Sequence, residues 1–594
     1  MNETTQQPRP ADFHPERLQE ERKKKLRSRT IWALALLVLV AIFGTLFYVA
    51  YLGRRPVELQ LAKARLAILP FAASARPNDA WLGWGLSTVV AETLNQTPGM
   101  DVLPPDRLRQ LLAQRGLDPA NRETRATARQ LAFAAGAGLV LDGEFRRRED
   151  GKVSLLFELI APDQKAAHRG ELQAKDALTL AAQLSESIAR GMVPEIEGAQ
   201  LETIFGTDPF FARLYGEGVQ QLSAPGSASQ KAAAARPYFE ILLRNDPTFT
   251  RAKARLVDCL RDLGELDRAR TMAEQLLQET LPRGELDLQV SSFRSLGMID
   301  ALQADEVAAA EQFRLAHRAA LARQDKGGEL MVLGDLVRLA LAHSDRNKAE
   351  ELLVEMVQVQ KAQGDRLGEA DSLLEIGSLY LAAGDFDGAA KVLEESQKLL
   401  KGANDLWGVQ RISANLGEIA WRRGDVALAG DYWEKALEFY RKQKDELRIL
   451  MMTRNLGEAQ IRAGRYAQAE KLVIDLRELA KARGDHRTEA EACVSQAWLQ
   501  LRLGYPLQAK EPLDCARGLT TYLSDRSRLD QVIAWLAYEE GNYDQALQGW
   551  TELKAGAGAA WSEEQEQFLK VFAAAKTSGR RLNLPGEPNY EPPS

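Results

Sequence analysis

The sequence predicts a mainly α-helical protein in which one membrane-spanning helix precedes a small α/β domain and a long α-solenoid. A fixed period is the first observation, because seven alanines lie 40 residues apart: Ala269, Ala309, Ala349, Ala389, Ala429, Ala469 and Ala509. Such a constant period is typical of stacked helical repeats. The second observation is an apolar stretch without charge at residues 31–52. The third is a region of interleaved strand and helix patterns between that stretch and the repeats.

Composition and charge favour a folded protein and argue against a nucleic-acid partner. The chain has 594 residues, more than one ordinary domain, with 45% hydrophobic and 27% charged residues. Its net charge of −6 gives no case for nucleic-acid binding. The charge is uneven, because residues 1–30 hold eight basic and five acidic side chains. We therefore predict a basic amino-terminal tail on an otherwise acidic chain.

The cysteines are sparse. Cys259, Cys493 and Cys515 are too few for a disulfide framework and lack the spacing of a zinc site. Cys493 and Cys515 fall on antiparallel helices of one repeat, so a bridge between them is geometrically feasible. Burial of all three as small apolar side chains is the favoured interpretation.

Residues 31–52 have the length and composition of a membrane helix. About 20 residues of helix cross a hydrocarbon core of about 30 Å. Six basic residues precede this stretch: Arg22, Lys23, Lys24, Lys25, Arg27 and Arg29. Only Arg54 and Arg55 follow it closely, so the positive-inside rule predicts a cytoplasmic tail over residues 1–30 and a bulk across the membrane. A cleaved signal peptide is the alternative, but its apolar stretch would be about 7–15 residues long.

Residues 56–195 are predicted to form the α/β domain, because strand and helix patterns alternate along them. The predicted strands are 65–71, 101–103, 138–146, 152–160 and 168–174. The predicted helices are 84–96, 107–115, 124–135 and 177–191. The Asp150-Gly151 step indicates a hairpin turn between two of the strands.

Three motifs in this region resemble the TolB-like amino-terminal domain. They are LAILPF at 66–71, WLGWGLSTVVAETLNQTPGMDVLP at 81–104 and AGAGLVLDGEFRRREDGKVSLLFELI at 135–160. The resemblance spans roughly residues 64–192 and implies a position between a membrane helix and helical repeats, as in CadC-like transmembrane regulators. Those relatives carry a cytoplasmic output domain before the membrane helix, whereas 29 residues are too few to form one.

Residues 208–555 are interpreted as about nine helical hairpins. Their pattern resembles the tetratricopeptide repeat, in which small residues stand where the two helices of a hairpin approach most closely. The residues expected at these positions are Gly377, Gly417, Gly457, Ala389, Ala429 and Ala469. The 40-residue unit is similar to the longer-helix variant of kinesin light chains. Residues 577–594, rich in Pro, Gly and polar residues, are predicted to be a disordered tail.

The resemblance also implies a peptide-binding surface. In the family, the first helix of each repeat lines the concave face, and an asparagine two places before the small glycine binds ligand main chain. Asn415 and Asn455 stand at that place, and an amide both donates to C=O and accepts from N–H. The charged residues expected beside them are Arg411, Arg454, Glu418, Glu458, Arg422 and Arg462. A solvated helix surface is an equally consistent interpretation.

Signals for catalysis are weak. The sequence lacks GxxxxGK[ST], GxSxG, HExxH and paired CxxC motifs, and its five histidines show no metal-ligand spacing. We therefore predict no enzymatic activity, no metal and no cofactor.

The sequence favours a protein scaffold or accessory sensor that binds a protein or peptide partner. It predicts a single-pass protein of a bacterial inner membrane, with a cytoplasmic amino terminus and a periplasmic bulk; the compartment rests on the TolB-like resemblance. Two alternatives stay open. One is an envelope assembly factor or chaperone near the translocon, and the other is a signalling receptor subunit whose α/β domain binds a small ligand.

Overall fold

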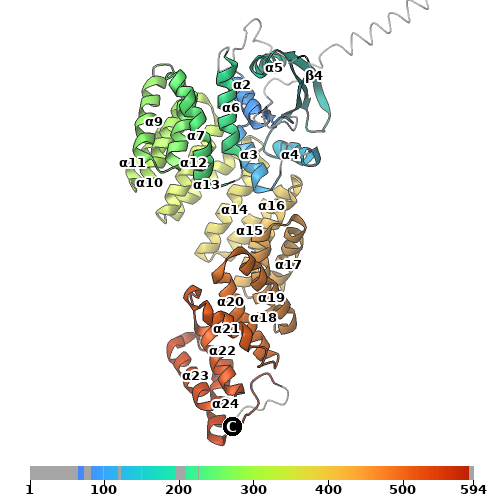
Figure 1. Cartoon of the computed structure of the whole chain (residues 1–594), viewed down its shortest axis with the longest axis vertical. Helices are drawn as coiled ribbons and strands as arrows, with labels where there is room; N and C mark the ends of the chain where they lie inside the picture. Colours follow the sequence, from blue (N-terminus) through green and yellow to red (C-terminus); the bar gives the residue numbers. More distant parts are fainter. Residues whose placement is uncertain are drawn as a thin grey trace, which may run out of the picture.

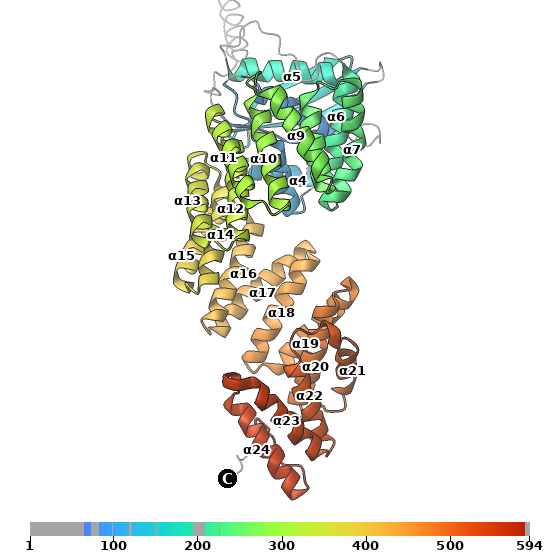
Figure 2. The same ribbon diagram turned by 90° about the vertical axis from the view of Figure 1, so that its left-hand side faces the viewer.

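The computed structural model describes residues 64–72, 82–97, 99–117, 122–148, 150, 152–193, 208–224 and 226–587. Within them, a small α/β domain lies against one end of a long helical solenoid, and the carboxyl-terminal helices lie at the other end (Figures 1 and 2). The predicted basic tail and the predicted membrane stretch at 31–52 lie outside the described residues. None of the helices in the described ranges is both long and apolar enough to cross a membrane.

The α/β domain is built on a four-stranded sheet in the order β1-β2-β3-β4. The strands are β1 (Leu66–Ile68), β2 (Leu139–Arg147), β3 (Val153–Ile160) and β4 (Ala166–Ala174). β1 pairs parallel with β2, and the other two pairs are antiparallel. The helices of the domain are α2 (Trp84–Asn95), α3 (Pro105–Gln114), α4 (Arg122–Ala134) and α5 (Ala177–Met192). The predicted strand at 101–103 is reduced to one bridge, between Val102 and Leu66.

Strand β1 has a core on each face, because successive side chains of a strand point to opposite sides. Leu66 and Ile68 pack with α2 and α5, whereas Ala67 and Leu69 pack with α3 and α4. All four side chains are at most 3% exposed. The run that was predicted to be a buried strand is therefore buried on both faces.

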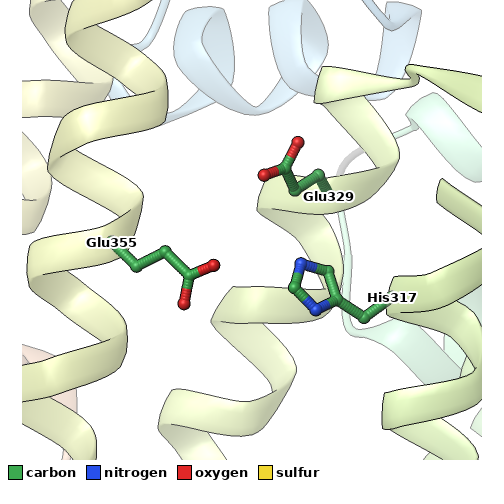
Figure 3. A group of neighbouring side chains, drawn as sticks. All are labelled: His317, Glu329 and Glu355. Atoms are coloured by element: carbon green, nitrogen blue, oxygen red, sulfur yellow. The ribbon is translucent and has the colours of Figure 1, made fainter. Parts of the chain in front are cut away.

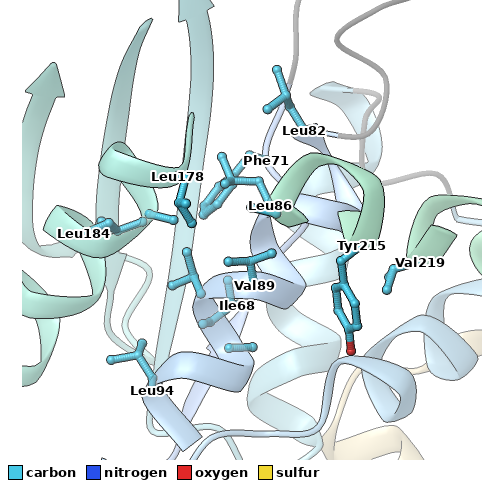
Figure 4. Close-up of a cluster of buried hydrophobic side chains, with 14 of the residues drawn as sticks. Ile68, Phe71, Leu82, Leu86, Val89, Leu94, Leu178, Leu184, Tyr215 and Val219 are labelled. Atoms are coloured by element: carbon cyan, nitrogen blue, oxygen red, sulfur yellow. The ribbon is translucent and has the colours of Figure 1, made fainter. Parts of the chain in front are cut away.

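The hydrophobic core of the domain continues into the solenoid. Tyr215 and Val219, on the first solenoid helix, lie beside Leu86 and Val89 of α2 (Figure 4). On the opposite face of the sheet, Leu111 of α3 shares a second buried cluster with repeat residues as far along the chain as Ile419. The domain and the first half of the solenoid therefore fold around shared cores.

The solenoid consists of antiparallel helix pairs. The first helices of the pairs are α6 (Pro209–Ser223), α8 (Thr250–Asp262), α10 (Leu286–Leu302), α12 (Lys326–Ala342), α14 (Arg366–Ala383), α16 (Leu406–Arg422), α18 (Glu446–Arg462), α20 (His486–Arg502) and α22 (Ser527–Glu539). The second helices are α7 (Ala228–Asn245), α9 (Leu266–Thr280), α11 (Glu306–Arg323), α13 (Arg346–Ala362), α15 (Phe386–Gly402), α17 (Val426–Gln443), α19 (Tyr466–Arg483), α21 (Lys510–Gly518) and α23 (Tyr543–Ala557). Two short 3-10 turns, η2 (Thr520–Tyr522) and η3 (Gly558–Ala560), follow α21 and α23, and α24 (Glu563–Ser578) ends the array.

Aspartates repeated along the sequence begin the solenoid helices. Asp325, Asp365, Asp405, Asp445 and Asp485 each accept a hydrogen bond from the backbone N–H three residues on, at the first helix of a pair. A second series, Asp305, Asp345, Asp385 and Asp425, caps the second helices in the same way. Each such cap contributes about 1 kcal/mol to the helix that it begins. The aspartates that recur every 40 residues in the sequence therefore mark the starts of successive solenoid helices.

The small residues of the repeat stand where two helices meet, although the closeness of the contact differs among them. Ala389, Ala429 and Ala469 are fully buried. A Cβ on Gly377 would lie 2.8 Å from Leu393, and one on Gly417 would lie 2.6 Å from Nε1 of Trp433. Gly457 also faces the second helix of its pair, but less closely, because a Cβ there would lie 3.7 Å from Val473, which is ordinary contact. Val473 fills less space than the tryptophan that faces Gly417.

The carboxyl-terminal segment is ordered further than the sequence predicted. Residues 579–587 pack back on the last helices instead of forming the beginning of a disordered tail. Leu584 is fully buried, and the Tyr538 hydroxyl accepts a hydrogen bond of 2.7 Å from the N–H of Leu582. Arg581 lies beside Glu539 at 2.9 Å. These contacts and α24 cover the exposed end of the last helix pair, which a terminal repeat requires. Residues 588–594 of the predicted tail lie outside the described residues.

Two of the three cysteines form a disulfide, which corrects the favoured interpretation of them as free side chains. Cys493 of α20 is bonded to Cys515 of α21, with a sequence separation of 22 residues. Cys259 is free and buried, and burial raises its pKa to about 12. The bridge joins the two helices of one repeat, as their antiparallel packing allows.

The contrast between two glycines gives a test of the packing. Alanine favours a helix by about 1 kcal/mol over glycine, and overpacking costs about 1–3 kcal/mol. Trp433 cannot withdraw easily from Gly417, because it is 2% exposed and its Nε1 donates to the Ala414 carbonyl at 3.1 Å. We expect Gly417→Ala to lower the thermal midpoint of unfolding and the matched Gly457→Ala to leave it unchanged or raise it. Equal shifts in circular dichroism melts of the two variants would contradict this packing.

Candidate protein-binding groove

The α/β domain covers the surface that the first helices of the early pairs would otherwise present. Arg115 of α3 forms a buried ion pair with Asp405, and its Nε lies 3.1 Å from the carboxylate. Arg65, before β1, donates to Gln363 at 3.0 Å, and Arg323 donates to the carbonyl of Asn95 at 2.8 Å. These contacts extend from α11 to the start of α16.

A buried polar network seals the other end of this contact. The hydroxyl of Tyr215 on α6 donates to Glu92 of α2 at 3.0 Å. Arg255 of α8 donates to the same hydroxyl at 3.2 Å and to Glu92 at 2.9 Å. Burial, and then the Glu92 carboxylate, raise the pKa of the Tyr215 hydroxyl, so it stays protonated and able to donate. The α/β domain therefore contacts the solenoid at several points between α6 and the start of α16.

Beyond this contact the solenoid has an open groove. A cavity of about 420 Å³ lies between α16, α18, α20 and the segment that leads into α22. Its lining is Glu418, Trp421, Trp433, Arg454, Asn455, Glu458, Ile461, Val473, Leu476, Glu491, Ala492, Val494, Ser495, Leu523, Ser524, Asp525 and Arg528. We call this surface the open groove.

The structure brings four of the predicted binding residues into the open groove. They are Asn455, Arg454 and Glu458 on α18 and Glu418 on α16. Asn455 is half-buried, and the structure gives its amide no hydrogen-bond partner within the described ranges. The amide is therefore unpaired within the described residues, and its role in binding a ligand's main chain stays a prediction.

The other four predicted residues lie outside the lining. Arg411 is paired with Asp371 of α14 and lies over the ring of Trp407, at 5.6 Å. Arg422 donates to Glu418 at 2.7 Å, and Arg462 stacks 4.1 Å from the centre of the Trp421 ring. Asn415 is half-buried on α16, one repeat before Asn455. Arg422 and Arg462 therefore contact side chains that line the groove, whereas the partners of Arg411 lie outside it.

The sequence analysis did not predict the tryptophans in the floor of the open groove or the arginine that a later repeat contributes to it. Trp421 and Trp433 pack together, with ring centroids 5.9 Å apart, and both line the groove. They carry a usable signal in the sequence, since two tryptophans lie on facing helices of one repeat. Arg528, which lies 3.4 Å from Glu458, gave no such signal, because it is 70 residues away along the chain.

The charges of the open groove are held in exchangeable pairs. Glu458 and Arg528 are each about 40% exposed, and Arg454 lies 3.8 Å from Glu491. Exposed pairs of this kind contribute about 0–1 kcal/mol each. A partner with charged side chains can therefore replace these ion pairs at little cost in free energy. The groove has apolar side chains in its floor and both acidic and basic side chains at its rim.

Comparison with known families and structures agrees with this architecture. Models of the tetratricopeptide repeat match residues 227–283 and 409–482, so the chain contains tetratricopeptide repeats. No curated protein matches the chain.

Solved structures show the same kind of repeat at low identity. The apo form of RapI is 13% identical to this chain. The match covers 58% of this chain and 98% of RapI, with a TM-score of 0.43. A signal transduction ATPase with a tetratricopeptide repeat sensor from Pyrococcus horikoshii is 11% identical over 62% of this chain and 56% of its own, with a TM-score of 0.39. A Rap protein complexed with Competence and Sporulation Factor is 12% identical to this chain. The match covers 58% of this chain and 96% of the Rap protein, with a TM-score of 0.32. All three scores are below 0.5, so these likenesses say nothing of this chain's ligand.

Proposed function

We propose that this chain is a scaffold that binds an extended segment of a partner protein in the open groove between α16 and α22. The observation that carries the proposal is the division of the solenoid surface. Its first half is covered by the chain's own α/β domain, whereas its second half leaves a cavity of about 420 Å³ with Asn455 in its lining. Tetratricopeptide repeats act mainly through such surfaces and seldom through a catalytic centre.

The chemistry of the open groove suits a peptide. The Asn455 amide offers both a donor and an acceptor, which matches the alternating C=O and N–H groups of an extended main chain. Trp421, which is partly exposed above the buried Trp433, offers an apolar surface, and aromatic side chains are enriched where partners bind tightly. The pairs at the rim add specificity for charged side chains more than affinity.

Membrane anchoring and a periplasmic bulk complete the proposal. The uncharged stretch at 31–52 and the basic residues before it support an anchored protein with its amino terminus in the cytoplasm. The Cys493–Cys515 bond supports an oxidising compartment for the repeats. The TolB-like character of residues 64–192 stays a prediction. In this proposal the domain is a fixed spacer between the membrane and the open groove.

A receptor for a small ligand is the second candidate, and one cavity favours it. About 440 Å³ lie where the end of α2 meets α8, α10 and α11, lined in part by Gln96, Arg251, Asp287 and Arg323. Arg251 donates to Asp287, and the lining is largely polar. A small anionic or polar ligand there would contact the α/β domain and the solenoid at once. A ligand-dependent rise in thermal stability that Arg251→Ala abolishes would favour this candidate.

Photocrosslinking from the open groove tests the scaffold directly. A photoreactive residue at Asn455 is expected to give one dominant adduct in cells, because the position lies in the open groove. The same residue at Glu434, on the exposed face of α17, is the matched control and is expected to give none. The adduct, identified by mass spectrometry, should weaken about tenfold when Trp421, which lines the groove and is partly exposed, becomes Ala.

The other outcomes separate the alternatives. A broad smear of unrelated adducts from Asn455 would favour the chaperone or assembly factor. Equal yields from Asn455 and Glu434 would contradict a specific groove.

The compartment is tested through the disulfide. We expect Cys493 and Cys515 to resist alkylation in denatured extracts of cells that were trapped with acid, and to react after reduction. The matched measurement is Cys259, which is expected to react without reduction once the chain is denatured. Free Cys493 and Cys515 in the trapped cells would place the repeats in a reducing compartment and contradict the periplasmic proposal.

A further inference from the structure

Three side chains that commonly bind metals lie together outside the open groove. His317 of α11, Glu329 of α12 and Glu355 of α13 point toward one another (Figure 3). One ligand atom of each lies within 4.8 Å of the others. The prediction from the sequence that the histidines have no metal spacing missed this cluster, because the stacking of helices creates it rather than a local motif.

The histidine in this cluster has an unused nitrogen. The Nε2 atom of His317 is shielded from solvent and has no hydrogen-bond partner among the described residues. Most enclosed polar atoms have a partner, and an exception calls for a missing group such as an ion. An imidazole nitrogen without a proton is a good ligand for a divalent metal.

The carboxylates supply matching negative charge. Glu329 is 4% exposed, and a buried carboxylate is unfavourable unless cations compensate it. Lys326 lies 2.7 Å from Glu329 and provides one positive charge. The two glutamates and this lysine leave one net negative charge, so a divalent cation is electrostatically favourable.

We propose that His317, Glu329 and Glu355 bind a divalent transition metal, with Zn²⁺ as the expected ion. One nitrogen and two carboxylate ligands suit zinc, and ligand bonds of about 2.0–2.2 Å place neighbouring ligand atoms about 3.4 Å apart. Because the three ligands come from three consecutive helices, the metal would fix two neighbouring repeats against each other. A fourth position remains for water or for a ligand atom of a partner.

Calorimetric titration with Zn²⁺ tests this site. The probe is added to the untagged full-length chain after treatment with a chelator. We expect one Zn²⁺ per chain and a loss of affinity of roughly 100-fold in His317→Ala and at least about 10-fold in Glu355→Gln. His343→Ala is the matched control, because His343 contacts a single carboxylate, that of Glu306 at 2.9 Å, and its loss should leave the affinity unchanged.

Two results would overturn the site. One is the absence of zinc binding at concentrations up to about 100 μM, where a specific zinc site of a protein would be filled. The other is unchanged affinity in both His317→Ala and Glu355→Gln. Circular dichroism of each variant shows whether it folds, and Glu355→Gln preserves the shape of the side chain if the histidine variant does not fold.

Discussion

The arrangement of this chain depends on the ion pair between Arg115 and Asp405. Asp405 is one of the aspartates that recur along the repeats, and its other oxygen accepts a hydrogen bond of 3.1 Å from the N–H of Gly408 at the start of α16. Both members of the pair are almost completely buried. Such a pair adds little net stability, but the loss of one partner leaves an uncompensated buried charge, which costs about 3–5 kcal/mol. The pair therefore specifies where on the solenoid the α/β domain lies.

This placement gives the two halves of the solenoid different roles. Contacts from Arg65, Glu92 and Arg115 hold the α/β domain against the helices up to the start of α16. From there to α22 the solenoid surface is open, with two tryptophans in its floor. The open groove consequently lies in the half of the solenoid remote from the α/β domain. In the proposed topology, the membrane would lie beyond residue 64, and the open groove would project away from it.

The repeats were predictable because their signals are local and recur. The alanines at 40-residue spacing are buried at helix contacts, and the aspartates at the same spacing begin helices. The strands of the α/β domain were also predictable from apolar runs such as residues 66–71. Four of the eight predicted binding residues line the open groove, since a first-helix position is fixed by the repeat pattern.

What the sequence left open depends on contacts between distant residues. The docking of Arg115 on Asp405 spans 290 residues, and nothing in either segment announces the other. Arg528 enters the open groove only because α22 stacks two pairs after α18. The Cys493–Cys515 bond and the return of residues 579–587 to the last helices likewise depend on packing that no local pattern contains.

The most direct measurement of the central claim is a disulfide between the α/β domain and the solenoid. A Cβ on Gly327 would lie 2.9 Å from Cγ of Pro104, within reach of a bridge when both residues are cysteine. We expect Pro104→Cys with Gly327→Cys to form this bond in the full-length chain, seen as a linked peptide pair by mass spectrometry. The pair Pro104→Cys with Gly457→Cys is expected not to form it. Absence of the first bond, or equal formation of both, would contradict the docked arrangement.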